Sequence, residues 1–419
     1  MRKTFPILPA LALAAKIFLG CGDPKTEISE QHFPQEVSHQ TPIPVEDIRE
    51  EGEIPLAPIN CSRVYQNALA QITGIQINSV GNLAWTEALF YTNGETVWKG
   101  NETVWYGDAE KTVKVQDFTR EEGETVFDAL PILSERFLSL SMLSSKAQRN
   151  TNTFYDPQQN ELQATNLETV LAADADTDTD VFIAPLAEKD ANNNSFAQYH
   201  PETKTTTNIC PISPEEVYQP ILTTDLALSE NLLYIPSRAS PSSGQEWELA
   251  LRLCDVTNGG QLVLPMPEPF IQLAVENSRV VYLRPLEDSP LYGLLRTIDM
   301  NALASENFLV NGEEKSYLFV FRNAENSNDL ISLSQLQLSE EYVVFTSCED
   351  ALLRDTCESE ERVAVYGYDF SQRRLERISP FWHQPSPMQY DIAAVKGKFV
   401  AYLARRGMIE NLYLCEREE

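Results

Sequence analysis

A unit of four short strand-like runs recurs along most of this 419-residue chain. The clearest copy has an apolar run at 333–338, a polar turn at Ser339-Glu340-Glu341, a second run at 342–345, a third run ending in Asp369 and a fourth at 375–378. Copies begin near residues 75, 125, 169, 221, 270, 331 and 390. A four-stranded antiparallel unit cannot bury both of its faces alone, but units stacked in a ring can. The sequence therefore predicts an all-β chain folded as a β-propeller, with seven four-stranded blades favoured and six or eight as alternatives.

The repeat at residues 342–378 resembles the TolB-like propeller repeats of bacterial envelope proteins. The resemblance rests on a Val-rich second strand, a loop, and a third strand ending in Tyr366-Gly367-Tyr368-Asp369 before a turn. It covers residues 57–419 and is clearest in the C-terminal half. The chain departs from the family because Ser339-Glu340-Glu341 replaces the usual Asp-Gly turn. The resemblance implies a fold and no activity. Two packed β-sandwiches are the alternative architecture, since they also contain many short strands.

The start of the chain resembles a bacterial lipoprotein export signal. A cationic start is followed by a mainly apolar run over residues 5–19 and then by Leu19-Gly20-Cys21. The resemblance implies cleavage after Gly20, so that residues 1–20 are a signal peptide, and lipidation of Cys21, which anchors the protein to a membrane. It places the protein in the cell envelope, periplasmic or surface-exposed. Gly22 after the cysteine favours the outer membrane over the inner one.

Two other interpretations of this N-terminal run are an ordinary membrane anchor and a buried helix. A membrane-spanning helix needs about 20 consecutive apolar residues. This run is shorter and is interrupted by Lys16. Residues 21–56 are rich in Asp, Glu and Pro and contain few apolar side chains. Such a composition cannot offset the entropy of ordering the chain, so we expect a flexible acidic tether before a propeller domain at 57–419.

The cysteines provide an independent test of the ring. Apart from Cys21 there are six, an even number that favours disulfides in an exported chain but allows fifteen connectivities. The repeat alignment selects the pairs Cys61–Cys415, Cys210–Cys254 and Cys348–Cys357. Cys61 begins a run that supplies the missing fourth strand of the last blade, which closes the ring with strands from both ends of the chain. Metal binding by these cysteines is the weaker alternative, because Cys-x-x-Cys is absent from the sequence.

The charge balance restricts the partners. The chain carries 62 acidic and 32 basic residues, a net charge of −30. A surface this acidic repels phosphate backbones, so we expect no nucleic-acid partner. Solubility in the envelope is a sufficient reason for the charge, and binding of a cation or a basic partner is the alternative. We expect a monomer that contacts the membrane through its lipid and has a protein partner in the envelope.

The acidic cluster with the most regular spacing consists of four aspartates at alternate positions: Asp174, Asp176, Asp178 and Asp180. Alternating carboxylates converge on calcium when the chain turns sharply. Here Thr179 stands where a calcium loop needs glycine, and Pro185 stands where it needs a bidentate Glu. The sequence therefore favours a solvated turn over a calcium site, and it indicates no other cofactor.

Two tryptophans are the candidates for ligand contact. Trp98 and Trp105 flank Gly100-Asn101-Glu102 in a predicted hairpin of the first blade. Aromatic side chains on strands more often pack between neighbours than bind ligands, so packing is the preferred interpretation and binding of carbohydrate or peptide the alternative.

The sequence assigns no catalytic residue. It has no Gly-x-Ser-x-Gly, and neither His200 nor His383 lies in a nucleophile motif. We therefore expect a membrane-anchored lipoprotein whose propeller is a protein- or ligand-binding scaffold. The alternative is a propeller enzyme that acts on polysaccharide or peptide in the envelope.

Overall fold

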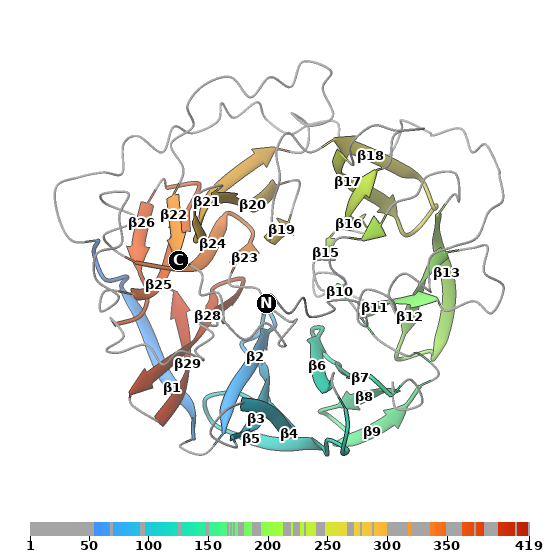
Figure 1. The fold of residues 1–419 in the computed structure, drawn as a ribbon, viewed down its shortest axis with the longest axis horizontal. Helices are drawn as coiled ribbons and strands as arrows, with labels where there is room; N and C mark the ends of the chain where they lie inside the picture. The colour runs from blue at the N-terminus through green and yellow to red at the C-terminus, as the bar shows by residue number, and fades with distance from the viewer. Residues whose placement is uncertain are drawn as a thin grey trace, which may run out of the picture.

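The computed structural model describes residues 54–417 except for gaps, of which 300–316, 321–335, 349–362 and 381–392 are the longest. Residues 1–53 lie outside the described part. Within the described part, the strands form seven antiparallel sheets, six with four strands and one with five. The sheets are arranged around a common centre (Figure 1). The predicted β-propeller is confirmed, and the two-sandwich alternative is wrong.

Each blade is built from strands that follow one another along the chain. Blade 1 contains β2 (Gln71–Ile77), β3 (Leu83–Thr92), β4 (Val97–Gly107) and β5 (Thr112–Phe118). Blade 2 contains β6 (Phe127–Leu133), β7 (Leu138–Ser144), β8 (Thr151–Asp156) and β9 (Glu161–Ala164). Blade 3 contains β10 (Ala172–Asp174), β11 (Val181–Leu186), β12 (Asn194–His200) and β13 (Thr205–Ile212).

The next blades continue the same order. Blade 4 contains β14 (Gln219–Pro220), β15 (Ala227–Ser229), β16 (Leu232–Ala239), β17 (Glu248–Asp255) and β18 (Gln261–Pro265). Blade 5 contains β19 (Gln272–Glu276), β20 (Arg279–Leu286), β21 (Ser289–Asp299) and β22 (Tyr317–Val320). Blade 6 contains β23 (Leu336–Ser339), β24 (Tyr342–Cys348), β25 (Val363–Asp369) and β26 (Arg374–Arg377).

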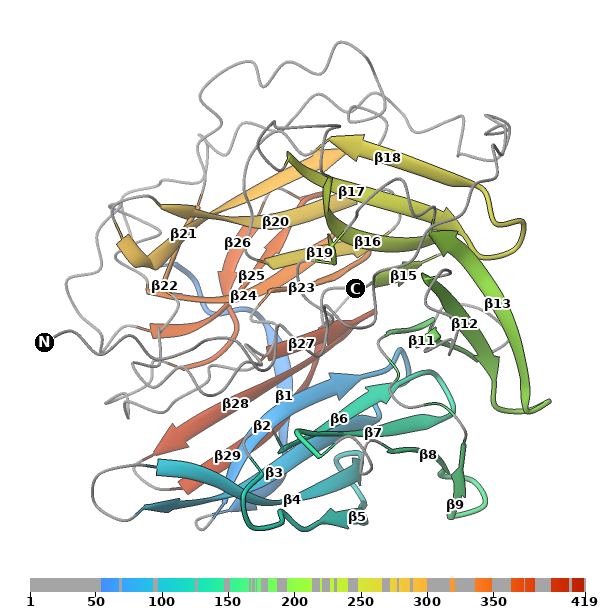
Figure 2. The same cartoon turned by 45° about the vertical axis from the view of Figure 1, so that its right-hand side comes forward.

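Blade 7 closes the ring with both ends of the chain. It contains β27 (Ala393–Lys396), β28 (Phe399–Arg406), β29 (Ile409–Arg417) and, as its outer strand, β1 (Ile59–Asn67). Strand β1 runs antiparallel to β29, and Cys61 faces Cys415 in the register. Figures 1 and 2 show the two strands side by side. The closure follows the arrangement expected from the sequence.

The chain just before β1 also belongs to the propeller. Leu56 forms a parallel bridge to Arg377 of β26. The Ala57 amide donates to the Arg377 carbonyl at 2.8 Å, and the Arg377 amide donates to the Pro55 carbonyl at 2.8 Å. Ile54 is only 5% exposed. Residues 54–56 therefore lie against the outer edge of blade 6, just before β1.

The core lies between neighbouring blades. One cluster joins Ile72 and Trp85 of blade 1 to Ala401 and Leu412 of blade 7. Similar clusters join blades 3 and 4, and blades 6 and 7. Burial of apolar surface stabilises by about 25 cal/mol per Å². The blades are therefore held by face-to-face packing, which is why one repeat alone would not fold.

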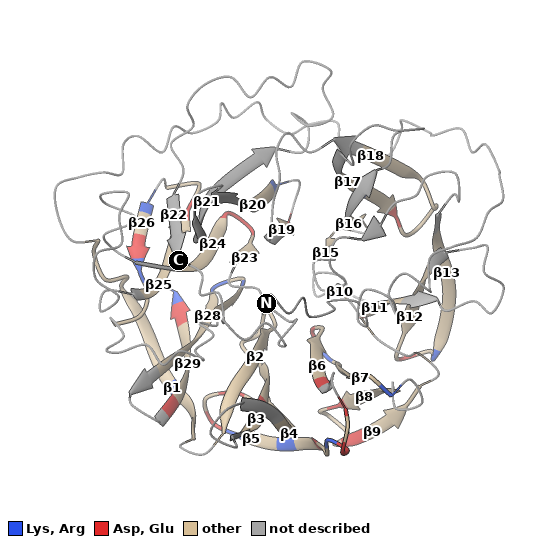
Figure 3. Ribbon diagram, in the orientation of Figure 1, with Lys and Arg blue, Asp and Glu red and all other residues tan. Residues whose placement is uncertain are grey.

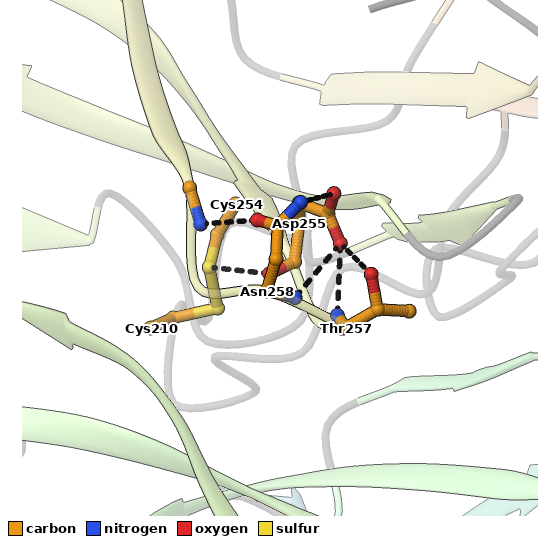
Figure 4. The surroundings of a disulfide bond; sticks show 6 residues. Cys210, Cys254, Asp255, Thr257 and Asn258 are labelled. Atoms are coloured by element: carbon orange, nitrogen blue, oxygen red, sulfur yellow. Dashed lines mark hydrogen bonds between the residues drawn. A yellow bond between two sulfur atoms is a disulfide. The ribbon is translucent and has the colours of Figure 1, made fainter. Parts of the chain in front are cut away.

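The aspartate that ends a blade's third strand has a structural role. Asp255 accepts hydrogen bonds from the amides of Thr257 at 2.8 Å and Asn258 at 3.3 Å (Figure 4). Asp369 accepts equivalent bonds from the amides of Ser371 and Gln372. A short carboxylate that binds amides two and three residues ahead stabilises a tight turn. The recurring aspartate thus fixes the turn into the fourth strand.

Blade 6 makes its first turn without the glycine that its neighbour uses. Gly397, between β27 and β28, has a φ of 54°, a left-handed conformation suited to glycine. Glu340 takes the corresponding place between β23 and β24 with a φ of 52°. Glu340 of blade 6 therefore adopts the same left-handed conformation as Gly397 of blade 7.

Candidate functional site

The structure contains two of the three expected disulfides. Cys61 and Cys415 are bonded across β1 and β29, with their Cα atoms 4.0 Å apart and a sequence separation of 354. Cys210 and Cys254 are bonded between blades 3 and 4, with a sequence separation of 44 (Figure 4). Cys348 ends β24, but Cys357 lies outside the described residues, so the third pair stays a prediction.

Trp105 lies in an aromatic cluster between blades 7 and 1. Its ring is stacked on that of Trp85 with centroids 6.3 Å apart, and the ring of Tyr65 lies 5.2 Å away. Trp85 is fully buried, while Trp105 and Tyr65 are half-buried. Trp98 lies on the same strand, β4, but its side chain is outside the described part. Trp105, the candidate whose side chain is described, therefore packs between blades 7 and 1.

A buried carboxylate organises this cluster. Glu87 is 7% exposed and accepts a hydrogen bond from the Trp105 indole Nε1 at 2.8 Å. It accepts a second hydrogen bond from the Asn67 side-chain amide. Burial, with the charge of Glu87 as the second cause, raises the pKa of Tyr65 well above its usual range. The carboxylate thus ties β1 to the second and third strands of blade 1.

Two other glutamates, each on the third strand of its blade, join neighbouring blades. Glu102, near the middle of β4, accepts a hydrogen bond from the Ala129 amide of blade 2 at 2.5 Å. Glu410, at the start of β29, accepts one from the Ile72 amide of blade 1 at 2.6 Å. Their exposures are 1% and 3%, so both carboxylates are buried. A buried carboxylate that loses its hydrogen-bond donors destabilises the folded state. Each of these two glutamates therefore fixes the position of the inner strand of the next blade.

The aspartate cluster is only partly within the described residues. Asp174 ends β10, Asp176 and Asp178 lie outside the described part, and Asp180 precedes β11. The Asp180 carboxylate accepts a hydrogen bond from the Arg136 amide at 3.1 Å. Among the described residues, no group of three or more His, Cys, Asp or Glu side chains is arranged to hold a metal ion. In this structure Asp180 connects blade 3 to blade 2.

Turns between the first and second strands are linked in series by polar contacts; we name these contacts the turn network. The Asn78 side-chain amide of blade 1 donates to the Glu135 carbonyl of blade 2 at 2.8 Å. The Arg136 amide donates to Asp180, just before β11 of blade 3, at 3.1 Å. The Arg136 side chain also pairs with Asp156 at the end of β8 and with Glu202 between β12 and β13. The turn network thus continues from blade 1 through blade 2 to blade 3.

The turn network has a second part between blades 5, 6 and 7. Arg279 pairs with Glu341 at 2.7 Å, and Lys396 pairs with Glu276 at 3.1 Å. The Gly397 amide donates to the Ser339 hydroxyl at 2.8 Å. Lys396 belongs to blade 7 and Glu276 to blade 5, so their ion pair passes the inner strand of blade 6. Figure 3 shows that acidic and basic segments occur on the same blades, as on β26.

Blades 6 and 7 are also joined by a cation–π contact between Arg417 and Tyr342. The Arg417 guanidinium lies 3.4 Å from the ring centroid of Tyr342 and 3.4 Å from Asp369 Oδ2. The Tyr342 hydroxyl donates to Glu376 Oε1 at 2.8 Å. Burial, with the charge of Glu376 as the second cause, raises the pKa of Tyr342 far above its usual range. This phenol is therefore a structural hydrogen-bond donor at any physiological pH.

The buried tyrosines predict a loss of stability at alkaline pH. Burial raises the pKa of Tyr106 and of Tyr402 from 10.0 to about 12. Because the folded state favours the neutral phenols, their contribution is complete below pH 10 and is lost as the pH rises to about 12. We expect the free energy of unfolding in urea to fall over that interval, and to fall less steeply in Tyr402→Phe. Tyrosinate absorbance that develops fully near pH 10 in the folded protein would contradict this.

Comparison with known proteins finds similar solved structures at low identity and at TM-scores below 0.5. No family model and no curated protein matches the chain. The β-propeller domain of the Trilobed protease from Pyrococcus furiosus is 10% identical with a TM-score of 0.49, covering 84% of this chain and 96% of that one. Uncomplexed acylaminoacyl peptidase from Pyrococcus horikoshii is 12% identical with a TM-score of 0.47, covering 83% and 51%. An oligogalacturonate lyase in complex with manganese is 10% identical with a TM-score of 0.39, covering 85% and 99%.

These similarities do not assign an activity. The chain spans about half the length of the acylaminoacyl peptidase chain. At such identities the likeness concerns the arrangement of strands alone, and function depends on sites that unrelated propellers do not share. No helix in the described part is both long and apolar enough to cross a membrane.

Several residues that organise the blades were not singled out from the sequence: Glu87, Glu102, Arg136, Lys396, Glu410 and Arg417. A usable signal existed for Glu87, because it is the one charged residue in the mainly apolar segment from Leu83 to Phe90. An acid in such a run is buried only where it has partners.

Proposed function

We propose that this protein is a membrane-anchored lipoprotein of the cell envelope whose propeller is a binding scaffold for a protein or ligand. The supporting observation is where the N-terminal chain enters the ring. Residues 54–57 lie against β26, β1 completes blade 7, and Cys61 is bonded to Cys415. A tether that leads from a lipidated Cys21 would thus join the propeller at its reinforced closure.

A rigid ring that carries surface loops favours a role in binding over a role in catalysis. The buried carboxylates of Glu87, Glu102 and Glu410 hold neighbouring strands in place. Their hydrogen bonds fix the blades relative to one another, so loops carried by the blades keep constant spacing. Constant spacing lowers the entropy cost of binding. The net charge of −30 favours a partner surface that is basic or neutral over a nucleic acid.

The experiment for this proposal compares the wild type with Cys21→Ser in the native cell. We expect the wild type to incorporate labelled fatty acid and to fractionate with membranes, most of it with the outer membrane. Cys21→Ser lacks the thiol that is lipidated, so it should lose the label and leave the membrane fraction. Crosslinking in intact cells should capture a discrete envelope protein with the wild type and much less of it with Cys21→Ser.

Gly367→Ala is the control that separates anchoring from binding. This variant keeps Cys21 but disturbs blade 6, as argued in the Discussion, so it should stay membrane-bound and lose the captured partner. Capture that persists at equal abundance in Gly367→Ala would assign binding to the tether and overturn the scaffold proposal. Membrane association that persists in Cys21→Ser would overturn the lipid anchor.

A further inference from the structure

The two described disulfides differ in their access to solvent. Cys210 and Cys254 are both 0% exposed. Cys415 is also 0% exposed and packs beside Val400 in the apolar cluster between blades 6 and 7. Cys61, by contrast, is exposed, together with its neighbours on either side in β1. The ring-closing bond therefore includes one solvent-exposed cysteine residue, whereas both cysteines of the other bond are buried.

The strand that carries Cys61 is held by its pairing with β29 and, near its C-terminal end, by Tyr65 against Trp85 and Trp105 and by Asn67 on Glu87. In β1 only Ile59, Val64, Tyr65 and Asn67 are half-buried, and the other side chains are exposed. Its backbone pairs with β29 from Ile59 to Asn67, with an irregularity between Arg63 and Tyr65. Among the described strands, none pairs with the other side of β1. An edge strand with few buried side chains opens at lower free energy than a core strand, so a covalent bond matters more for it.

We propose that Cys61 is a thiol-exchange site. A dithiol oxidoreductase that reduces Cys61–Cys415 would allow β1 to separate from β29 in blade 7. Reduction of Cys61–Cys415 leaves β1 attached by hydrogen bonds and a few half-buried side chains. The strand can then leave β29, which changes the closed ring into one with an open edge. This inference concerns the bond between β1 and β29 and does not depend on lipidation of Cys21.

The exchange requires one external dithiol and no other co-reactant. A thiolate of the dithiol attacks Sγ of Cys61 and forms a mixed disulfide, and Cys415 leaves as a thiolate that takes a proton from water. The second thiol of the reagent then attacks the mixed disulfide, which releases Cys61 and leaves the reagent as a disulfide. Two electrons pass to the protein. Cys415 is a poor leaving group because apolar burial disfavours its thiolate, so the reaction needs a dithiol that can complete the second step.

Departure of β1 would uncover one edge of β29. The β29 backbone groups now paired with β1 would lose their partners, while Leu412 and Leu414 of β29 belong to the buried cluster with Ile72 and Trp85 of blade 1. The change that thiol exchange at Cys61 produces is therefore an open edge on β29.

Arg63 gives a direct readout of β1. It is an exposed trypsin site inside the paired strand, and a protease needs an extended, unpaired segment to cut it. The full mature protein is treated with increasing dithiothreitol under native conditions, followed by alkylation and peptide mapping. We expect Cys61 and Cys415 to be alkylated at least about tenfold faster than Cys210 and Cys254. Trypsin cleavage after Arg63 should rise by about the same factor in the reduced protein.

Matched variants separate the two disulfides. Cys61→Ala should be cut rapidly after Arg63 without reductant. Cys210→Ala/Cys254→Ala keeps the ring-closing bond, so its cleavage should stay slow until dithiothreitol is added. Arg63→Gln should show no new cleavage in β1 under any condition. Equal alkylation rates for the two disulfides, or slow cleavage after Arg63 in the reduced protein, would overturn the proposal. These outcomes do not involve the membrane, so they are independent of the proposed function.

Discussion

Replacement of Gly367 by alanine should lower the free energy of unfolding by more than about 3 kcal/mol, beyond the usual cost of overpacking. Gly367 faces Tyr342, and a Cβ there would lie 2.8 Å from the ring atom Cε1 and closer still to Cζ and the hydroxyl. Tyr342 is 2% exposed and has no room to move, because Arg417 covers its ring and Glu376 accepts its hydroxyl hydrogen bond. Urea unfolding of the wild type and the variant measures the difference.

Two further variants show whether space or backbone conformation is the cause. At Gly123 a Cβ would meet nothing within 4 Å, but φ is +80°. Gly123→Ala should therefore cost only about 1–2 kcal/mol, the price of the left-handed backbone. Tyr342→Ala creates a cavity that accepts the new methyl group, so Gly367→Ala should add little in that background. Additive costs in the double variant would show that Tyr342 is not what limits residue 367.

The ring was predictable because its physical cause is repeated along the chain. Each blade needs apolar runs on both faces and polar turns between them, and this pattern recurs from β2 to β29. The closure was predictable because Cys415 lacked a strand beside it and Cys61 lay in a strand without a blade. The aspartates that end third strands, such as Asp255, could be predicted for the same reason, because each stabilises the same turn in its blade.

The contacts that hold one blade to the next were not predictable. The chain has 62 acidic residues, and nothing local distinguishes the buried Glu102 or Glu410 from exposed ones. Their burial depends on which amide of the next blade lies opposite, which is a property of the assembled ring. The parallel bridge from Leu56 to Arg377 is a similar case, because it joins the end of an acidic, Pro-rich segment to an edge in blade 6.

Removal of the ring-closing disulfide should have the largest effect on stability. In Cys61→Ala the exposed sulfur is lost, while the buried thiol of Cys415 keeps its packing. The change therefore isolates the crosslink. On the chain-entropy model, a bond between residues separated by 354 positions contributes about 5–6 kcal/mol by restricting the unfolded chain. We expect the free energy of unfolding to fall by that amount in urea, with a larger denaturant dependence because the unfolded chain expands.

The matched variant also removes the buried thiol of Cys415. Cys61→Ala/Cys415→Ala should be less stable than Cys61→Ala by only about 1–2 kcal/mol, the cost of a small cavity beside Val400. If Cys61→Ala alone cost less than about 2 kcal/mol with an unchanged denaturant dependence, the crosslink would not be restricting the unfolded chain. The ring would then depend on the packing between blades 6, 7 and 1 for its closure. The outer strand β1 would be a covering of blade 7 and not the element that completes it.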